Sequence, residues 1–182
     1  MPPLPVQENR RPPLLRIGCL TLAFSLFAHI GLATAQAVRP ETARGYCFAH
    51  AAHTYGVNQQ VLLAIAWRES HLQPWKVHHN SDGSTDYGVM QINSRNLPFL
   101  GLTQQSALEL CPNILAGARL YRRAIQRYGN TWAAVGAYHS TTPMLRQRYA
   151  RDVQQSFALI SRFDAWRSRL RQFFCRVLSP IC

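Results

Sequence analysis

The chain has 182 residues, 47% of them hydrophobic, and carries a formal net charge of +12. This length supplies one domain with a proper core and leaves too little for a second. A strongly basic chain suits polyanions of several kinds, including nucleic acid, anionic lipid and the acidic glycan-peptide polymer of a bacterial wall, so charge alone excludes none of them.

The first 36 residues are predicted to be a secretory signal peptide. Three arginines precede an uncharged stretch from Ile17 to Leu32, and a run of small residues follows. This is the layout of a cleaved signal, with cleavage after Ala35 or Ala37. A membrane anchor is the alternative, but about 16 apolar residues are fewer than the roughly 20 of a spanning helix. We therefore expect an exported protein.

Four cysteines remain after the signal, and an even count in an exported chain indicates disulfides, for which three pairings exist. We favour Cys47 with Cys111 and Cys175 with Cys182, because each pair then lies within one compositional segment. The first bridge would stabilise the fold by about 4 kcal/mol in the chain-entropy model. The histidines and cysteines lack the tight spacing of a zinc site, so we predict neither a metal nor another cofactor.

The periodicity after the signal is helical nearly everywhere. A first helix is expected over Cys47–Tyr55, ended by Gly56. Asn58 is a candidate N-cap for a second helix, which continues to Ser70. Residues 71–101 are rich in turn-forming residues and predict loops or a minimal β-hairpin, the kind of segment that often holds site residues.

Three further helices are predicted from candidate N-caps. Thr103 would cap a helix to Leu110, Asn113 one to Gly129, and Thr131 a short one over Trp132–Tyr138. Residues 146–182 then form a basic, helical C-terminal tail in which arginines alternate with aromatic residues. This tail can be an amphipathic helix on a membrane surface or partner, or a terminal helix packed on the domain with a solvated basic face.

One carboxylate stands in an unusual place. Leu62, Ile65, Ala66 and Glu69 fall at i, i+3, i+4 and i+7, so on a helix the acid shares a buried stripe with three apolar side chains. Burial raises the pKa of a carboxyl group, which keeps it able to donate a proton near neutral pH. We therefore interpret Glu69 as a general acid. The alternative is a structural carboxylate paired with an arginine such as Arg68 or Arg119.

Between Cys47 and Tyr149 the sequence offers no second carboxylate on a buried helical stripe. Asp82 lies in a turn, Glu109 on a polar helix face, and Asp86 is at most a doubtful partner. Most glycoside hydrolases use two carboxylates. One suffices if the substrate supplies the nucleophile, as muramic acid can when its 6-hydroxyl attacks its own anomeric carbon to form a 1,6-anhydro ring.

Three segments in register resemble the catalytic domain of the soluble-type lytic transglycosylases: Ala66-Trp67-Arg68-Glu69-Ser70, Tyr87-Gly88-Val89-Met90-Gln91-Ile92-Asn93 and Ala134-Val135-Gly136-Ala137-Tyr138. In size and signal peptide the chain is similar to the small members that accompany type III and type IV secretion, conjugation and pili. The resemblance covers about residues 44–145. It implies a mainly α, lysozyme-like single domain over residues 37–145, with the short loop or hairpin region beside the cleft.

By this resemblance Glu69 matches the catalytic acid/base, and five residues are expected to contact substrate: Ser70, Met90, Gln91, Asn93 and Tyr138. Met90 can instead belong to the core, Gln91 and Asn93 can satisfy loop backbone groups, and Tyr138 can be an ordinary core aromatic. The sequence departs from the family directly after Tyr138, where His139-Ser140-Thr141 replaces the usual Asn-Ala-Gly. We therefore do not transfer the family's substrate contacts to residues 139–141.

We thus expect a periplasmic peptidoglycan lytic transglycosylase, bound to glycan strands and serving a secretion, conjugation or pilus machine. A lysozyme-type muramidase, in which Asp86 places a water, is the first alternative. A non-catalytic wall-binding assembly protein is the second. We expect no nucleic-acid partner, because export and the absence of a recognisable binding motif count against one.

Overall fold

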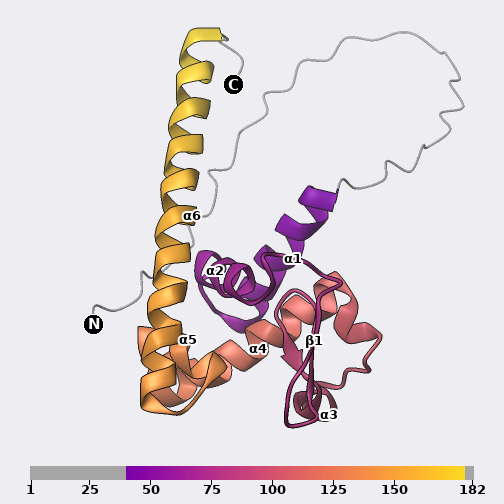
Figure 1. Ribbon diagram of the computed structural model, residues 1–182. Coiled ribbons are helices and arrows are strands. Elements are labelled where there is room, and N and C mark those ends of the chain that lie inside the picture. Colours follow the sequence, from indigo (N-terminus) through magenta and orange to yellow (C-terminus); the bar gives the residue numbers. More distant parts are fainter. Residues whose placement is uncertain (1–39, 179–182) are drawn as a thin grey trace, which may run out of the picture.

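A computed structural model describes residues 40–178 of the chain (Figure 1). It is mainly helical with one small sheet, as predicted. The elements in chain order are α1 (Pro40–Tyr55), α2 (Gln59–Ser70), β1 (Val77–His79), β2 (Thr85–Tyr87), β3 (Ile92–Asn93), the 3-10 turn η1 (Ser94–Asn96), α3 (Leu97–Leu100), the 3-10 turn η2 (Ser106–Leu108), α4 (Leu110–Tyr128), α5 (Trp132–His139) and α6 (Pro143–Leu178). The signal peptide and Cys182 lie outside the described residues, so the predictions made for them stay predictions.

Helix α2 is the buried centre of the fold. Asn58 caps it as predicted, because its Oδ1 accepts from the backbone N–H groups of Gln60 and Val61 at 2.9 and 3.1 Å. The helix packs against α1, α4 and α6, and it buries five apolar side chains completely: Val61, Leu62, Ala64, Ile65 and Ala66. After Ser70 two consecutive residues, His71 and Leu72, adopt positive φ values of 54° and 63° and turn the chain towards the sheet.

Helix α1 lies along α4, and a disulfide joins them. Cys47 and Cys111 form this bridge with their Cα atoms 5.1 Å apart, as the favoured pairing predicted. The helix begins at Pro40, earlier than expected, and ends at Tyr55 before Gly56, whose φ is 59°. The predicted pairing of Cys175 with Cys182 is not tested, because Cys182 lies beyond the described range.

Helix α4 is longer at its N-terminus than predicted. It begins at Leu110, and only a 3-10 turn at Ser106–Leu108 precedes it where a helix capped by Thr103 was expected. The prediction that Asn113 caps this helix is wrong. Asn113 lies inside α4 with 1% of its surface exposed. Its side-chain amide forms hydrogen bonds with backbone groups of Tyr87, Met90 and Ala107, which precede the helix, and does not cap the helix terminus.

Residues 77–93 form a three-stranded antiparallel sheet in the order β1-β2-β3, which confirms the minimal hairpin expected there. Val77 pairs with Tyr87 and His79 with Thr85, while Tyr87 also pairs with Ile92 on the other side. Only Tyr87 and Ile92 are buried on these strands, so the sheet contacts the core at one end and projects from the body at the other.

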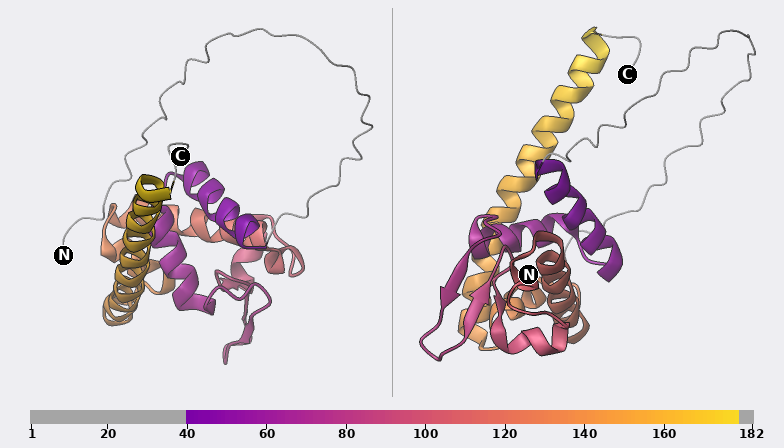
Figure 2. Two further views of the ribbon diagram at one scale, coloured as in Figure 1. Left: turned by 90° about the horizontal axis from the view of Figure 1, so that it is seen from above. Right: turned by 90° about the vertical axis from the view of Figure 1, so that its right-hand side faces the viewer.

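Helix α6 runs along one side of the molecule and continues well past the body (Figures 1 and 2). Its first half packs on α5 and α2. The predicted boundary between residues 145 and 146 falls within this continuous helix, and the division into a domain and a tail stays a prediction. Among the described residues, no helix is both long and apolar enough to cross a membrane.

Candidate active site

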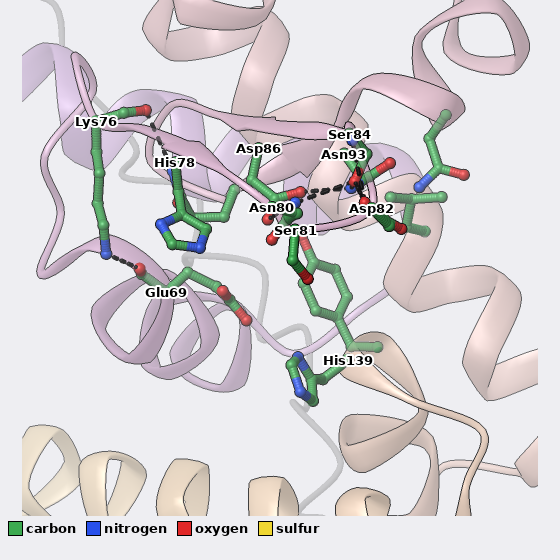
Figure 3. Close-up of a pocket in the computed structure, with 14 residues that line it drawn as sticks. Glu69, Lys76, His78, Asn80, Ser81, Asp82, Ser84, Asp86, Asn93 and His139 are labelled. Carbon is green, nitrogen blue, oxygen red and sulfur yellow. Dashed lines mark hydrogen bonds between the residues drawn. The ribbon is translucent and has the colours of Figure 1, made fainter.

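A cleft of about 710 Å³ lies between α2, the hairpin and the C-terminal end of α5. Figure 3 shows the Glu69 carboxyl pointing into it, with Asn80 and Asp86 of the hairpin on one side and His139 of α5 on another. The residues that line the cleft are Glu69, Lys76, His78, Asn80, Ser81, Asp82, Ser84, Asp86, Gln91, Asn93, Asn96, Leu120, Tyr138 and His139.

Glu69 has the environment predicted for a proton donor. Burial is the main influence and raises the pKa of its carboxyl group above the ordinary value of 4.5, although a hydrogen bond from Tyr149 and the nearby Arg68 guanidinium oppose the rise. The two arginines considered as ion-pair partners are engaged elsewhere. Arg68 pairs with Asp152 at 3.2 Å, and Arg119 Nη1 donates to the Phe99 carbonyl at 3.3 Å. A structural ion pair therefore does not explain Glu69.

Tyr149 is the residue that sequence reasoning missed. It lies on α6, outside the segment that carries the motifs, and its hydroxyl donates to Glu69 Oε1. Only 4% of its surface is exposed. A signal was present in the sequence: Tyr149, Ala150, Val153 and Phe157 form a helical apolar stripe that marks this part of the chain as packed rather than solvated.

His139, at the point where the sequence departs from the family motif, lies beside that tyrosine. Its ring stacks on the Tyr149 ring with centroids 4.9 Å apart and planes 5° from parallel. Burial and, secondarily, the charge of Arg68 lower the pKa of His139. The imidazole thus contributes a neutral planar surface to the cleft wall and stacks on Tyr149.

Ser70 and Lys76 fix the end of α2 that carries Glu69. The Ser70 hydroxyl donates to the Val89 carbonyl at 2.7 Å and accepts from the Gln73 N–H at 3.2 Å, and its side chain is completely buried. Lys76 Nζ donates to the Glu69 backbone carbonyl at 2.5 Å. Ser70 was expected to contact substrate; in this structure its side chain is completely buried, and its hydroxyl bonds to the backbone on both sides.

The turn from Gly88 to Gln91 is held by Asn113 of α4. The Met90 N–H donates to Asn113 Oδ1 at 2.7 Å, while Asn113 Nδ2 donates to the carbonyls of Tyr87 and Ala107 at 2.8 and 2.6 Å. Gly88, with φ of 73°, has no room for a side chain, because a Cβ would lie 2.5 Å from Asn113 Nδ2.

Met90 itself is completely buried, so the structure favours the core interpretation over the expected contact with substrate. Its side chain packs on Gly117 of α4, where an added Cβ would lie 2.6 Å from Met90 Cε. Gly117 is therefore a glycine required by close packing rather than by backbone conformation.

Gln91 and Tyr138 both line the cleft with Glu69, as expected from the motifs, and both also bond to the backbone of the turn. Gln91 Nε2 donates to the carbonyls of Gly88 and Lys76 at 2.8 and 3.2 Å. The Tyr138 hydroxyl donates to the Met90 carbonyl at 2.8 Å, and burial raises the pKa of this tyrosine. Each thus presents a fixed polar surface to the cleft.

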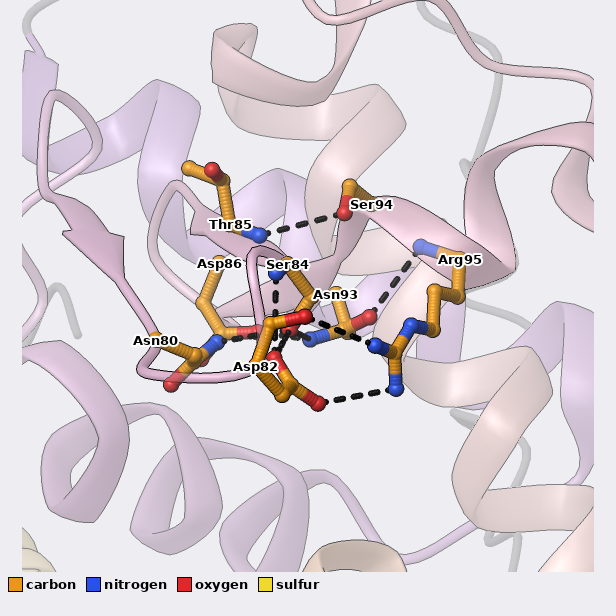
Figure 4. A network of polar contacts seen from close by, with 8 residues as sticks. All are labelled: Asn80, Asp82, Ser84, Thr85, Asp86, Asn93, Ser94 and Arg95. Atoms are coloured by element: carbon orange, nitrogen blue, oxygen red, sulfur yellow. Dashed lines mark hydrogen bonds and ion pairs between the residues drawn. The ribbon is translucent and has the colours of Figure 1, made fainter.

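Asp86 and Asn93 belong to a network of polar contacts that stiffens the hairpin (Figure 4). The Asn80 side-chain amide donates to Oδ2 of Asp86 at 2.9 Å, and the Asn93 side-chain amide donates to Oδ1 at 2.7 Å. Ser84 donates to Asp82, which in turn pairs with Arg95 at 2.8 Å. Both hairpin carboxylates that line the cleft, Asp82 and Asp86, thus already accept hydrogen bonds or an ion pair from neighbouring side chains. Within the described residues, no cluster of His, Cys, Asp and Glu could hold a metal ion.

Comparison with known proteins agrees with this geometry. Residues 46–160 match the family model of the transglycosylase SLT domain. The chain is 34% identical over 132 residues to the invasion protein IagB of Salmonella typhi, covering 68% of this chain and 82% of that protein. It is 32% identical over 130 residues to the protein IpgF of Shigella sonnei, covering 67% and 86%. A shorter match, 35% identical over 89 residues, relates it to protein virB1 of Rhizobium radiobacter, covering 36% and 37%. The segment that matches the family model, residues 46–160, contains Glu69, the hairpin, Tyr138 and Tyr149. The chain therefore belongs to the transglycosylase SLT family, the lytic transglycosylases of peptidoglycan.

Proposed function

We propose that the protein cleaves the β-1,4 bond between N-acetylmuramic acid and N-acetylglucosamine with Glu69 as its single acid/base, leaving 1,6-anhydro-muramic ends. The observation that carries this proposal is the asymmetry of the cleft carboxyl groups. Glu69 is half-buried and burial raises its pKa, whereas Asp86 accepts hydrogen bonds from two side-chain amides and Asp82 is ion-paired.

The chemistry requires two proton transfers at Glu69, which first donates a proton and then accepts a different one. Protonated Glu69 donates to the glycosidic oxygen as the bond from the muramic anomeric carbon breaks, and an oxocarbenium-like state forms. The 6-hydroxyl of the same sugar then attacks that carbon. The Glu69 carboxylate accepts the hydroxyl proton, which returns the enzyme to its starting state without consuming water.

The remaining cleft residues would bind the glycan. Gln91, Asn93 and Tyr138 line the cleft beside Glu69, and their amide and hydroxyl groups are already oriented by bonds to the turn and hairpin. Such fixed groups lose little freedom when substrate binds. Ser70 and Met90 would act indirectly by holding the α2 end and the turn in place.

A lysozyme-type muramidase remains the competing reaction. It needs a second group to place a water, and Asp86 lines the same cleft. The hydrogen bonds that Asp86 accepts from the Asn80 and Asn93 side chains favour a role in stiffening the hairpin, because both of its carboxylate oxygens already have donors.

We further propose that the protein acts in the periplasm, where it opens the wall locally for a secretion, conjugation or pilus apparatus. The support is the predicted signal peptide, the resemblance to the small members of the family, and the similarity to a protein named for invasion. A relative named peptidoglycan-binding-like protein, from Escherichia coli O157:H7, is 29% identical over 133 residues.

The decisive experiment is digestion of purified sacculi with the wild type and Glu69→Gln, with the released muropeptides identified by mass spectrometry. We expect anhydro-muropeptides from the wild type and none from a folded Glu69→Gln protein. Reducing-end products would establish the muramidase instead. Binding to sacculi without release of fragments by the wild type would contradict both enzymatic proposals and favour an assembly protein.

A further inference from the structure

The second half of α6 exposes a continuous apolar stripe that neither the fold nor the cleft uses. Large side chains recur at spacings of three and four residues, so they share one face of the helix. More than half of the surface is exposed at Leu159, Phe163, Trp166, Phe173 and Phe174.

Contacts with α2 show that this stripe faces away from the body. Gln60 bonds to Ser161 at 3.4 Å and to Asp164 at 3.0 Å, so these two residues mark the inward face of α6. At about 100° per residue, Trp166 and Leu159 lie nearly opposite that face. The C-terminal end of α6 projects past the domain (Figures 1 and 2), and the large side chains of the stripe are exposed to solvent.

Arginines border the stripe on both sides. Arg162, Arg169 and Arg176 follow one edge, and Arg167 and Arg171 lie towards the other, whereas Asp164 on the inward face is the only acid between residues 159 and 176. Aromatic side chains between rows of arginine, with small and polar residues on the opposite face, are the pattern of a helix lying in the interface of an anionic bilayer.

We propose that residues 159–176 of α6 bind the surface of a membrane that contains anionic phospholipid. The aromatic stripe would enter the headgroup region while the arginines contact lipid phosphates and the polar face stays in water. Because the cleft lies on other elements, this contact would hold the enzyme at a membrane without covering Glu69.

A second copy of the chain fits this surface less well. The spacing of Leu159, Phe163, Trp166, Leu170 and Phe173 is also that of a coiled-coil seam. The positions flanking such a seam would place Arg162 of one copy against Arg167 of the other in a parallel pair. In an antiparallel pair Arg162, Arg169 and Arg176 would face their own equivalents, and like charges at these positions repel.

The test is cosedimentation of the full exported chain with vesicles of phosphatidylcholine, alone or mixed with phosphatidylglycerol in equal parts. We expect binding to the anionic vesicles to be at least about tenfold tighter than to the neutral ones, and to weaken with salt. The triple substitution Phe163→Ser, Trp166→Ser and Phe173→Ser should reduce it about tenfold or more. Arg162→Glu with Arg169→Glu should have a similar effect.

The matched control is Ser168→Ala with Gln172→Ala, on the face opposite the stripe, which should bind like the wild type. All variants share the same N-terminal segment, so differences between them report on α6. Equal binding of the triple variant and the wild type would overturn the proposal, as would equal binding to neutral and anionic vesicles. Self-association of the wild type that the triple substitution abolishes, without vesicle binding, would identify a second copy as the occupant and overturn it too.

Discussion

Tyr149 of α6 donates its hydroxyl hydrogen to Oε1 of Glu69 on α2, although the two residues are 80 positions apart in the chain. The bond links the proposed acid to a helix that begins after the last recognisable motif. Burial raises the pKa of Glu69 and this bond lowers it, with burial the larger influence. The packing of α6 on α2 therefore supplies one of the influences on the proton affinity of the acid.

Replacing Tyr149 by Phe should change the pH dependence of cleavage. Glu69 must be protonated to start the reaction, so its pKa governs the alkaline limb of the profile. Loss of the Tyr149 bond removes an influence that lowers this pKa, and the limb should move to higher pH. Activity at the optimum should fall about tenfold or more because the carboxyl loses its orientation. Rates of sacculus digestion across pH measure both effects.

Tyr46→Phe is the matched control, because Tyr46 is 66% exposed on α1 and is not one of the residues that line the cleft. Its pH profile should overlay that of the wild type. An unshifted alkaline limb in Tyr149→Phe would show that the bond does not influence the Glu69 carboxyl during catalysis.

The sequence predicted the acid well because a carboxylate on a buried helical stripe is a local pattern. Leu62, Ile65 and Ala66 are indeed completely buried beside Glu69. Tyr149 and Asn113 could not be predicted in the same way, because their partners depend on how helices distant in sequence pack. Asn113 resembled an N-cap, yet its amide completes the Gly88 turn of another segment.

Glu69→Gln should stabilise the fold at neutral pH. A folded-state pKa above the unfolded value of 4.5 means that the native state favours the protonated form, so stability is lost as pH rises through the folded pKa. The glutamine variant does not ionise and keeps that stability. Thermal melts should show a gain for the variant at pH 7 that disappears below about pH 4, where both proteins are uncharged at this position; each kcal/mol corresponds to roughly 2–4 °C in a chain of this size.

Glu109→Gln provides the contrast for this measurement. Glu109 is exposed immediately before the first turn of α4, where a negative charge is favourable to the helix. Its replacement should give no gain at pH 7. Identical melting of Glu69→Gln and the wild type at neutral pH would contradict a burial cost at Glu69.

Asn113→Ala should destabilise the fold by roughly 3 kcal/mol and impair cleavage. The substitution leaves the buried Met90 N–H and the carbonyls of Tyr87 and Ala107 without their partner, and unsatisfied buried groups are costly. Urea unfolding measures the loss. The exposed Asn130 is a control site, where alanine should change stability by less than about 0.5 kcal/mol. A change at Asn113 no larger than at Asn130 would exclude it as the residue that holds the turn.

Removing the disulfide by Cys47→Ser with Cys111→Ser should cost about 4 kcal/mol, since the bridge closes a loop with a sequence separation of 64. The loss should appear in unfolding experiments under oxidising conditions and disappear when the wild type is reduced. Equal stability of the oxidised wild type and the double variant would mean that the bridge does not constrain the unfolded chain as the entropy model requires.

Gly136→Ala tests how closely α5 must approach α6. An alanine Cβ at this position would lie 2.2 Å from the Arg146 carbonyl oxygen, which belongs to the backbone of α6 and cannot move without the helix. We expect a loss of about 1–3 kcal/mol from overpacking. Cleavage should fall further than stability alone explains, because displacement of α6 carries Tyr149 away from Glu69.

The matched substitution is Gly45→Ala in α1, where no atom lies within 4 Å of the added Cβ. There the same change should stabilise the helix by about 0.5–1 kcal/mol with activity unchanged. Urea unfolding and sacculus digestion of the two variants together separate the packing requirement at Gly136 from the general effect of replacing a helical glycine, and equal outcomes at both positions would refute the requirement.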